Sequence, residues 1–264
     1  MDNTYWHKQA ADQPLFGDII WNKPEQRALA GKLAVIGGNA HGFSAVFQAV
    51  ATSQKAGIGT QRIVVPDILK RTLFKLWPEV EYAPSNKSGG FAVRALPNWL
   101  ELANWSDGVM IAGDLGRNSE TDMLLERFLE EYHGILTLAG DSVILIQNTP
   151  QTSMANAQIL IAADLPRLQH LLTAVRYPTA IRLEMPLTQL VDLLHGFSLA
   201  YPFSLITQQD GQIILARHGQ ISTTPMKSAS LMQAAAAATV WRLQQPHQDF
   251  AAMTSAVFTL NETD

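Results

Sequence analysis

The chain has 264 residues, of which 47% are hydrophobic, enough apolar side chains to fill the core of a large α/β domain. Its net charge is −4, and its lysines and arginines form no basic stripe, so we predict no nucleic-acid partner. The absence of cysteine excludes disulfides, thiolate zinc sites and a cysteine nucleophile. A polar N-terminus and the lack of a run of about 18 apolar residues predict no signal peptide, no membrane span and a cytoplasmic location.

Short apolar runs alternate with amphipathic segments along most of the chain. After a lead-in at 1–30, we predict strands at 33–38, 60–67, 80–85, 108–114 and 134–141. We predict helices between them at 43–57, 67–78, 95–105 and 119–134. Ser119 is the predicted N-cap of the last helix, with Asp122 at the capping-box position. The same rhythm continues through 159–175 and 186–197.

The pattern changes in the last quarter of the chain. Residues 202–224 alternate apolar and polar residues around Asp210-Gly211, which predicts an antiparallel hairpin at a sheet edge. Helices at 229–245 and 247–260 end the chain. The whole pattern predicts an α/β fold with a mostly parallel sheet between two layers of helices. Without linker or repeat, we expect one domain over 1–264, with 1–30 as a lead-in segment.

A glycine turn follows the strand at 33–38 and reads GGNAHG. Backbone N–H groups at the start of the next helix, together with the helix dipole, favour an anion there. A dinucleotide fingerprint requires glycine where Asn39 stands, and the P-loop pattern is absent. The turn is therefore either a ligand-binding corner or only a tight connection between strand and helix. Its candidate ligand-binding residues are Gly37, Gly38, Asn39, His41 and Gly42.

A second glycine stretch, IAGDLGRNSET at 111–121, also follows a strand and precedes a helix. The carboxyl ends of parallel strands share one edge of a sheet, which is where such folds bind ligands. We therefore take Gly113, Asp114, Gly116 and Arg117 as further candidate ligand-binding residues. The alternative is that the glycines only shape the loop and that the arginine is solvated.

The order of these segments resembles the ribokinase-like superfamily and, within it, the ADP/ATP-dependent NAD(P)H-hydrate dehydratases. Residues 37–59, GGNAHGFSAVFQAVATSQKAGIG, are similar to the family's glycine-rich turn, small-residue helix and G-x-G turn. AGDLGR at 112–117 is similar to its G-P-G-L-G-R signature. The resemblance implies a three-layer α/β/α fold and a nucleotide cleft that reaches Lys227 and Ser228. It also implies ATP or ADP as the nucleotide, an NAD(P)H-like ligand, and a homo-oligomer.

The departures from the family concern its chemistry. The family carries G-[ST]-G-D at the start of a late helix, where the aspartate is the base and the glycine N–H groups form an anion hole. Here the similar stretch is KSASLMQA, with Ser230 at the aspartate's place and no glycine. An unassisted serine hydroxyl cannot accept a proton near neutral pH. Asp141 and Asp164, in places similar to the family's D-A-D and T-P-H-P-G-E segments, are the candidate replacement acids.

Three functions fit these observations. The favoured interpretation is a degenerate member of the family that binds a nucleotide or related anion with little or no turnover. The first alternative is an active NAD(P)H-hydrate dehydratase or small-molecule kinase that uses a relocated acid. The second is a non-catalytic oligomeric interaction protein.

Histidine and carboxylate spacing adds no further active site. His41 lies in the first glycine turn, but a lone loop histidine is more often solvated or hydrogen-bonded than catalytic. No H-x-x-x-H pair or carboxylate cluster has metal-ligand spacing, so we predict no metal site. G-x-S-x-G is absent, which disfavours an α/β-hydrolase.

Overall fold

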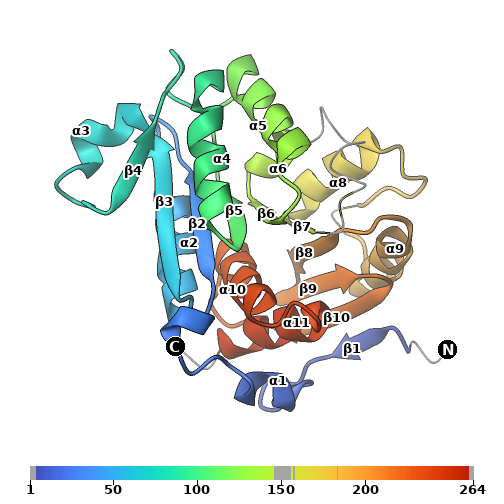
Figure 1. The fold of residues 1–264 in the computed structure, drawn as a ribbon. Coiled ribbons are helices and arrows are strands. Elements are labelled where there is room, and N and C mark those ends of the chain that lie inside the picture. Colours follow the sequence, from blue (N-terminus) through green and yellow to red (C-terminus); the bar gives the residue numbers. More distant parts are fainter. Residues whose placement is uncertain (1–3, 146–155, 157, 183, 262–264) are drawn as a thin grey trace.

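A computed structural model describes residues 4–145, 156, 158–182 and 184–261 (Figure 1). The ten described strands form one sheet in the order β1-β10-β9-β8-β7-β6-β5-β2-β3-β4. They are β1 (Trp6–Lys8), β2 (Lys32–Gly37), β3 (Thr60–Pro66), β4 (Val80–Ala83), β5 (Gly108–Ala112), β6 (Ile135–Ala139), β7 (Ile159–Ala162), β8 (Ser204–Gln209), β9 (Gln212–Arg217) and β10 (Gln220–Pro225). All neighbours pair in parallel except β8 with β9 and β9 with β10.

Helices cover both faces of this sheet (Figure 1). The α-helices are α1 (Gly17–Trp21), α2 (Ser44–Lys55), α3 (Lys70–Leu73), α4 (Leu96–Trp105), α5 (Ser119–Glu131), α6 (Ser142–Leu145), α8 (Leu165–Ala174), α9 (Leu187–Ala200), α10 (Leu231–Gln244) and α11 (Asp249–Thr259). Short 3-10 helices lie at η1 (Arg27–Leu29), η2 (Asp67–Leu69) and η3 (Val93–Ala95). In the part of the chain that the structure describes, no helix combines the length and apolarity that crossing a membrane requires.

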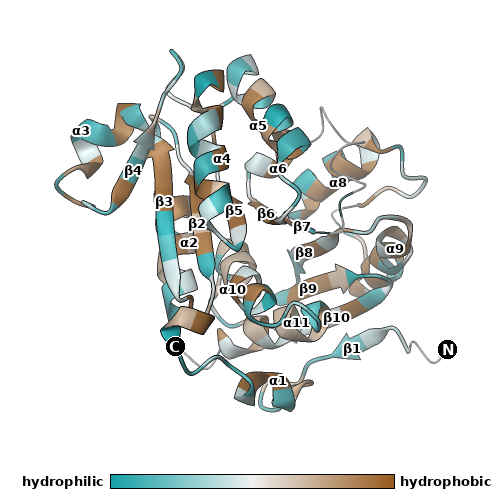
Figure 2. Ribbon diagram, viewed as in Figure 1, coloured by the Kyte–Doolittle hydropathy of each residue, from teal (hydrophilic) through white to brown (hydrophobic). Residues whose placement is uncertain are grey.

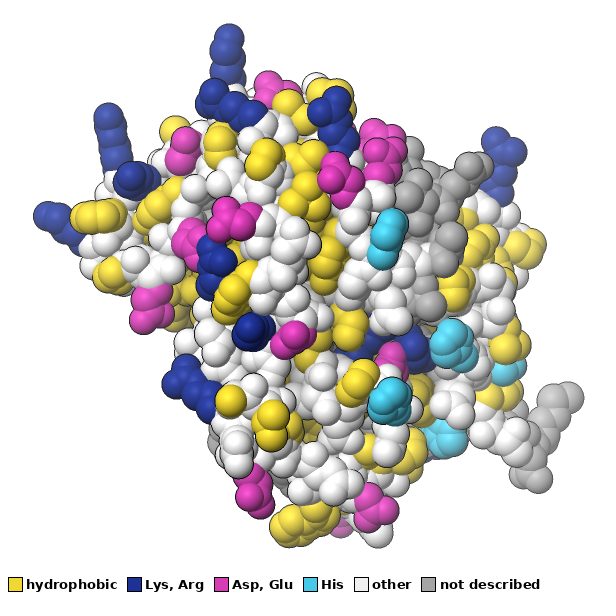
Figure 3. Space-filling model, in the orientation of Figure 1, with side chains coloured by type: hydrophobic (Ala, Val, Ile, Leu, Met, Phe, Trp, Pro, Cys, Tyr) yellow, Lys and Arg dark blue, Asp and Glu magenta, His cyan; other side chains and the backbone are white. Residues whose placement is uncertain are grey.

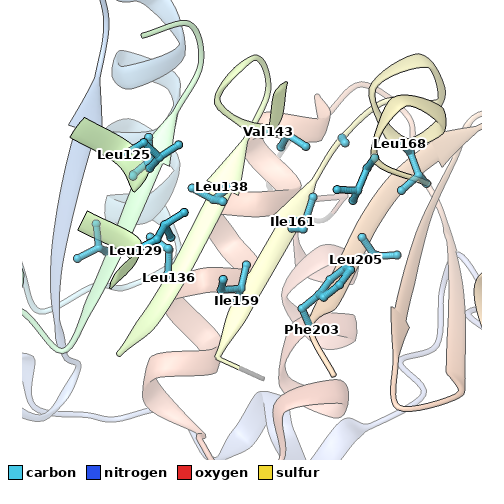
Figure 4. Close-up of a cluster of buried hydrophobic side chains, with 14 of the residues drawn as sticks. Leu125, Leu129, Leu136, Leu138, Val143, Ile159, Ile161, Leu168, Phe203 and Leu205 are labelled. Atoms are coloured by element: carbon cyan, nitrogen blue, oxygen red, sulfur yellow. The ribbon is translucent and has the colours of Figure 1, made fainter. Parts of the chain in front are cut away.

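Strand alternation divides the core into two. In β2, Ala34 and Ile36 belong to a core shared with α4, α5, α8 and α9, whereas Leu33 and Val35 belong to a core shared with α2, α10 and α11. Figure 4 shows part of the first core, where Leu136 and Ile159 lie among apolar side chains from α5 and the neighbouring strands. Figure 2 shows the hydrophobic colour on the central strands and hydrophilic colour on the outward faces of α4 and α5.

The predicted fold class is confirmed, as is the hairpin around Asp210-Gly211. The hairpin is not the outermost element, however, because β1 from the lead-in pairs in parallel with β10 beyond it. β1 has only three residues, which is too few to show a periodicity in the sequence. This strand is therefore defined only by its pairing with β10. The helix predicted over 67–78 is shorter than expected and consists of η2 and α3.

The predicted capping of the helix at 119–134 is wrong. Asn118, not Ser119, is the N-cap, and its side-chain oxygen accepts a hydrogen bond from the Glu120 N–H at 2.8 Å. Its amide nitrogen donates to the Ser88 hydroxyl at 2.9 Å, which ties the helix start to the 85–91 loop. Asp122 therefore closes no capping box, and burial raises the pKa of its carboxyl.

Candidate functional site

The two glycine turns meet in a hollow of about 340 Å³ at the carboxyl ends of β2, β5 and β6. We call it the glycine-turn hollow. Of the predicted site residues, those that line it are Gly38, Asn39, His41, Gly42, Gly113, Asp114 and Asp141. The hollow also contains residues that the sequence analysis did not select, namely Phe43, Ser44, Ala45, Val46, Ala112, Gly140, Arg167 and Met232.

The amide groups of the first glycine turn are used within the protein. The N–H groups of Asn39 and Gly42 bond each other's carbonyl oxygens at 3.0 and 3.1 Å, and the Ala40 N–H bonds the Gly89 carbonyl at 2.9 Å. The His41 N–H donates to the side-chain oxygen of Asn39 at 2.7 Å. These donors face the fold, so the turn itself is a tight connection rather than a phosphate cradle.

Asn39 explains why a side chain replaces glycine at this point. The residue is 1% exposed, and its Nδ2 donates to the Asp114 carbonyl at 3.0 Å. One carboxamide therefore bridges the two glycine turns and fixes their separation. The neighbouring Gly37 ends β2, where an added Cβ would lie 2.3 Å from the Ala112 carbonyl oxygen, so this glycine serves strand packing.

The start of α2 is the part of the hollow suited to an anion. Phe43 is its N-cap and provides no side-chain hydrogen bond to the first helical N–H groups. The first turn, Ser44 to Val46, lines the hollow. Because the N–H groups of a first helical turn have no intrahelical partner and carry the positive end of the dipole, they favour a negatively charged ligand.

The second glycine turn shapes the opposite wall. Gly113 has a φ of +78°, and an added Cβ would lie 2.4 Å from the Cβ of Ala45 at the start of α2. Asp114 accepts the Gly116 N–H at 2.8 Å, which closes the turn on itself. Gly116 packs against Gly90, and Arg117 is exposed, so neither lines the hollow.

Both candidate replacement acids are paired with one arginine. Arg167 bonds the Asp141 Oδ1 through Nε at 3.0 Å and Nη2 at 2.5 Å, and its Nη1 bonds Asp164. Asp164 also caps α8 by accepting the Arg167 N–H at 3.0 Å. Burial alone would lower the pKa of Arg167, but its bonds to the two carboxylates outweigh burial and the net pKa is raised. Both candidate acids therefore already have a guanidinium partner.

Ser230 is the N-cap of α10 and closes that helix with a capping box. The Gln233 N–H donates to the Ser230 hydroxyl at 3.2 Å, and the Ser230 N–H donates to the Gln233 Oε1 at 2.7 Å. Two of the N–H groups at this helix start are therefore used by its own capping side chains. Met232, in the first turn, lies against the glycine-turn hollow.

Lys227 and Ser228 lie elsewhere. They line a separate hollow of about 370 Å³ beside the β8–β9 turn, together with Asp210 and Gly211. The sequence analysis expected one cleft to include both these residues and the glycine turns, whereas the structure places them in separate hollows. Arg167 was also missed, although its position three residues after the N-cap Asp164 is a signal for an acid–base pair at a helix start.

Comparison with known proteins identifies the architecture through structure alone. No family model matches the sequence, and no curated protein matches it. A ribokinase-like superfamily protein from Enterococcus faecalis has a TM-score of 0.70 at 12% identity, covering 98% of this chain and 87% of that chain. An ADP/ATP-dependent NAD(P)H-hydrate dehydratase from Bacillus subtilis, co-crystallised with ATP and Mg²⁺, has a TM-score of 0.62 at 10% identity, covering 96% and 89%.

A vitamin kinase gives the same result at lower similarity. The phosphomethylpyrimidine kinase of Clostridium difficile has a TM-score of 0.54 at 12% identity, covering 88% of this chain and 100% of that chain. The mostly parallel sheet with helices on both faces agrees with these likenesses. The protein described here therefore has the ribokinase-like fold.

Proposed function

We propose that the protein binds a nucleotide, or a related phosphate-bearing molecule, in the glycine-turn hollow and does not turn it over. The observation that carries the binding half is the start of α2, where the first-turn N–H groups of Ser44 to Val46 line the hollow without a side-chain cap. The ATP with which the Bacillus subtilis dehydratase was co-crystallised supports a nucleotide as the first ligand to try, with ADP and an NAD(P)H-like molecule after it.

The charges around the hollow favour a ligand with hydroxyl groups as well as a phosphate. Asp114 and Asp141 line the hollow together with the start of α2, and Arg167 pairs with Asp141. Carboxylates accept hydrogen bonds from hydroxyl groups, whereas the N–H groups of a helix start donate to a phosphate. A sugar phosphate such as the ribose phosphate of a nucleotide fits this division better than inorganic phosphate does.

The absence of turnover is supported by two contacts. The capping box of Ser230 and Gln233 uses the N–H groups of both residues at the start of α10, and Arg167 pairs with both candidate acids. Catalysis of phosphoryl transfer or dehydration needs a proton acceptor and donors aimed at developing charge. We infer that neither the start of α10 nor the acid pair held by Arg167 supplies them.

A thermal-shift series with ATP, ADP, AMP, NADH and NADPH tests binding. One-site binding predicts about 2.7 kcal/mol of stabilisation at a hundredfold excess over Kd. Ser44→Glu adds a carboxylate to the first turn of α2 and is expected to abolish the shift, while Gln48→Glu, an equally exposed change one turn later, keeps it. No shift with any of the five compounds would overturn the binding proposal and favour the non-catalytic interaction protein.

An assay of hydrated NADH with ADP or ATP tests the proposal that the protein does not turn over its ligand. We expect no dehydration above the uncatalysed rate. Turnover by the wild type that Asp141→Asn abolishes would show that this acid works despite its arginine, and the active-enzyme alternative would replace the degenerate one.

We also propose self-association, with a second copy of this chain as the partner. Large apolar side chains are exposed on α2, η2 and the segment after α3, namely Phe47, Ile68, Phe74 and Leu76. The Phe47 and Trp77 rings lie 5.7 Å apart, which joins α2 to that segment, and β4 leaves a sheet edge beside it. Light scattering tests this: we expect a dimer or larger assembly that Phe74→Ser weakens, and a monomer at every concentration would refute it.

A further inference from the structure

A further hollow, of about 450 Å³, lies at the opposite end of α10 from the glycine-turn hollow. Met232 in the first turn of α10 lines the glycine-turn hollow, whereas Pro246, just after the end of the helix, lines this one. A helix of 14 residues separates them by roughly 20 Å. The walls come from β1, the β9–β10 turn and the start of α11, and we call it the basic hollow after Arg217, His218, His7 and His247.

Two guanidinium groups converge on one carboxylate at this hollow. Arg217 Nη2 lies 2.6 Å from the Asp249 Oδ2, and Arg242 Nε lies 3.2 Å from the same oxygen. Arg242 is fully buried and also donates to the Gln158 carbonyl at 2.8 Å. Burial lowers the pKa of both arginines, and the positive charge of Arg217 lowers that of Arg242 further. An added anion would relieve this repulsion.

The start of α11 opens into the same hollow. Gln248 is its N-cap and makes no side-chain hydrogen bond to the helix, and Asp249, Phe250 and Ala251 of the first turn line the hollow. The Asp249 side chain is directed to the arginines rather than to its own helix. The dipole of α11 therefore adds to the field of Arg217.

The β8–β9 and β9–β10 turns can be compared with each other. Asp210-Gly211 and His218-Gly219 both have positive φ at each residue, +50° and +71° in the first, +46° and +77° in the second. Aspartate or asparagine before glycine is the usual choice for such turns. The β9–β10 turn instead places an exposed imidazole at the rim of the basic hollow. The pKa of His218 is lowered, mainly by desolvation and also by the charge of Arg217. The neutral ring is therefore favoured beside that positive charge.

An aromatic cluster forms the rest of the wall. The His7 ring lies 5.5 Å from Phe250 and 6.3 Å from Phe16, and the two phenylalanine rings meet edge to face at 6.1 Å. Figure 3 shows histidine side chains (cyan) over the region of α11 and β10. They surround a patch of basic (dark blue) and acidic (magenta) side chains. Within the described residues no three His, Asp or Glu side chains are arranged to hold a metal ion.

We propose that the basic hollow is a second ligand site, which takes a small anion carried on an aromatic ring: the phosphate or carboxylate lies against Arg217, His218 and the start of α11, and the ring lies against Phe16, His7 and Phe250. The argument is independent of nucleotide binding in the glycine-turn hollow. A pocket of this size with an apolar wall and few convergent polar groups is typical of small-molecule sites.

Titration calorimetry with phenyl phosphate and with benzoate tests the proposal, and benzyl alcohol is the neutral control. We expect at least one of the two anions to bind, and benzyl alcohol to bind about tenfold more weakly, because a hydrogen bond to a charged group contributes more than one to a neutral group. The stronger anion distinguishes a phosphate ligand from a carboxylate ligand. No binding by either anion would overturn the proposal.

His218→Asn is the decisive variant, because asparagine suits the turn and the fold is kept. We expect it to weaken the bound anion by about tenfold and leave the ATP-induced shift unchanged. The matched control, Asp210→Asn, changes the same turn position in the other hairpin and is expected to bind as the wild type does. Wild-type affinity in both His218→Asn and His7→Gln would refute the site, and so would loss of phenyl phosphate binding in Ser44→Glu, which would place the ligand in the glycine-turn hollow.

Discussion

The last two helices of the chain begin in opposite ways. α10 starts with Ser230 and Gln233, whose side chains and backbone groups satisfy each other, whereas α11 starts without a side-chain cap beside two arginines. Both are helix N-termini with the same dipole. The difference shows that a helix start offers donors to a ligand only where the sequence leaves them open. In this chain the start of α10, which the family resemblance assigns to chemistry, is the one with a side-chain cap.

The largest predicted effect tests how much the buried arginine beside α11 stabilises the fold. Arg242→Ala removes a fully buried guanidinium and leaves Asp249 with one arginine fewer. We expect the free energy of unfolding to fall by about 4 kcal/mol, because the truncation leaves a cavity and takes a donor from the Gln158 carbonyl. Urea unfolding measures this loss. The exposed Arg94→Ala is the control, and an equal change in both variants would contradict the prediction.

The next effect concerns the wall between α2 and β5. Gly113→Ala adds a Cβ 2.4 Å from that of Ala45 at a φ of +78°. We expect a loss of about 3 kcal/mol, because two rigid backbones must separate. Gly42→Ala, in the same hollow, meets no atom within 4 Å and is expected to stay within about 0.5 kcal/mol of the wild type. Similar stabilities for the two variants in urea would show that the close approach is not needed.

A third prediction asks whether the capping box is what closes α10. Ser230→Ala removes the acceptor of the Gln233 N–H and is expected to lower the free energy of unfolding by about 1 kcal/mol. Added sulfate should then recover more stability in this variant than in the wild type, because the donors are open. Ser119→Ala is the control, since Asn118 caps α5. If sulfate affects Ser230→Ala and the wild type alike, the capping box is not the barrier.

The smallest predicted effect is a gain in the free energy of unfolding. We expect His218→Asn to raise the free energy of unfolding by about 0.5 kcal/mol at neutral pH, since asparagine tolerates a left-handed turn better. The folded pKa of His218 is lowered, so the stability contributed by its neutral ring is present above the unfolded pKa of about 6.5 and is lost as pH falls. The variant should therefore lose less stability on acidification. Urea unfolding at neutral and mildly acidic pH measures the gain in stability and its pH dependence. A pH dependence equal to that of the wild type would contradict the predicted smaller loss on acidification.

The sequence by itself determined the fold class. Periodicity located the central strands and the long helices, and Asp210-Gly211 located the hairpin, because these features depend on residues close in the chain. Their order also carried the ribokinase-like resemblance, through the two glycine turns and the stretch before Ser230. The helix start near Ser230, with a serine where the resemblance expects an aspartate, was likewise readable from the sequence.

Only the tertiary structure decided what surrounds those positions. β1 depends on its pairing with β10, and the spacing of the glycine turns depends on one bond from Asn39 to Asp114. The pairing of Asp141 and Asp164 by Arg167, and the meeting of Arg217, Arg242 and Asp249, join residues that no local pattern relates. Backbone preference acts over a few residues, whereas a binding site is made by contacts between distant segments, which only the packed chain specifies.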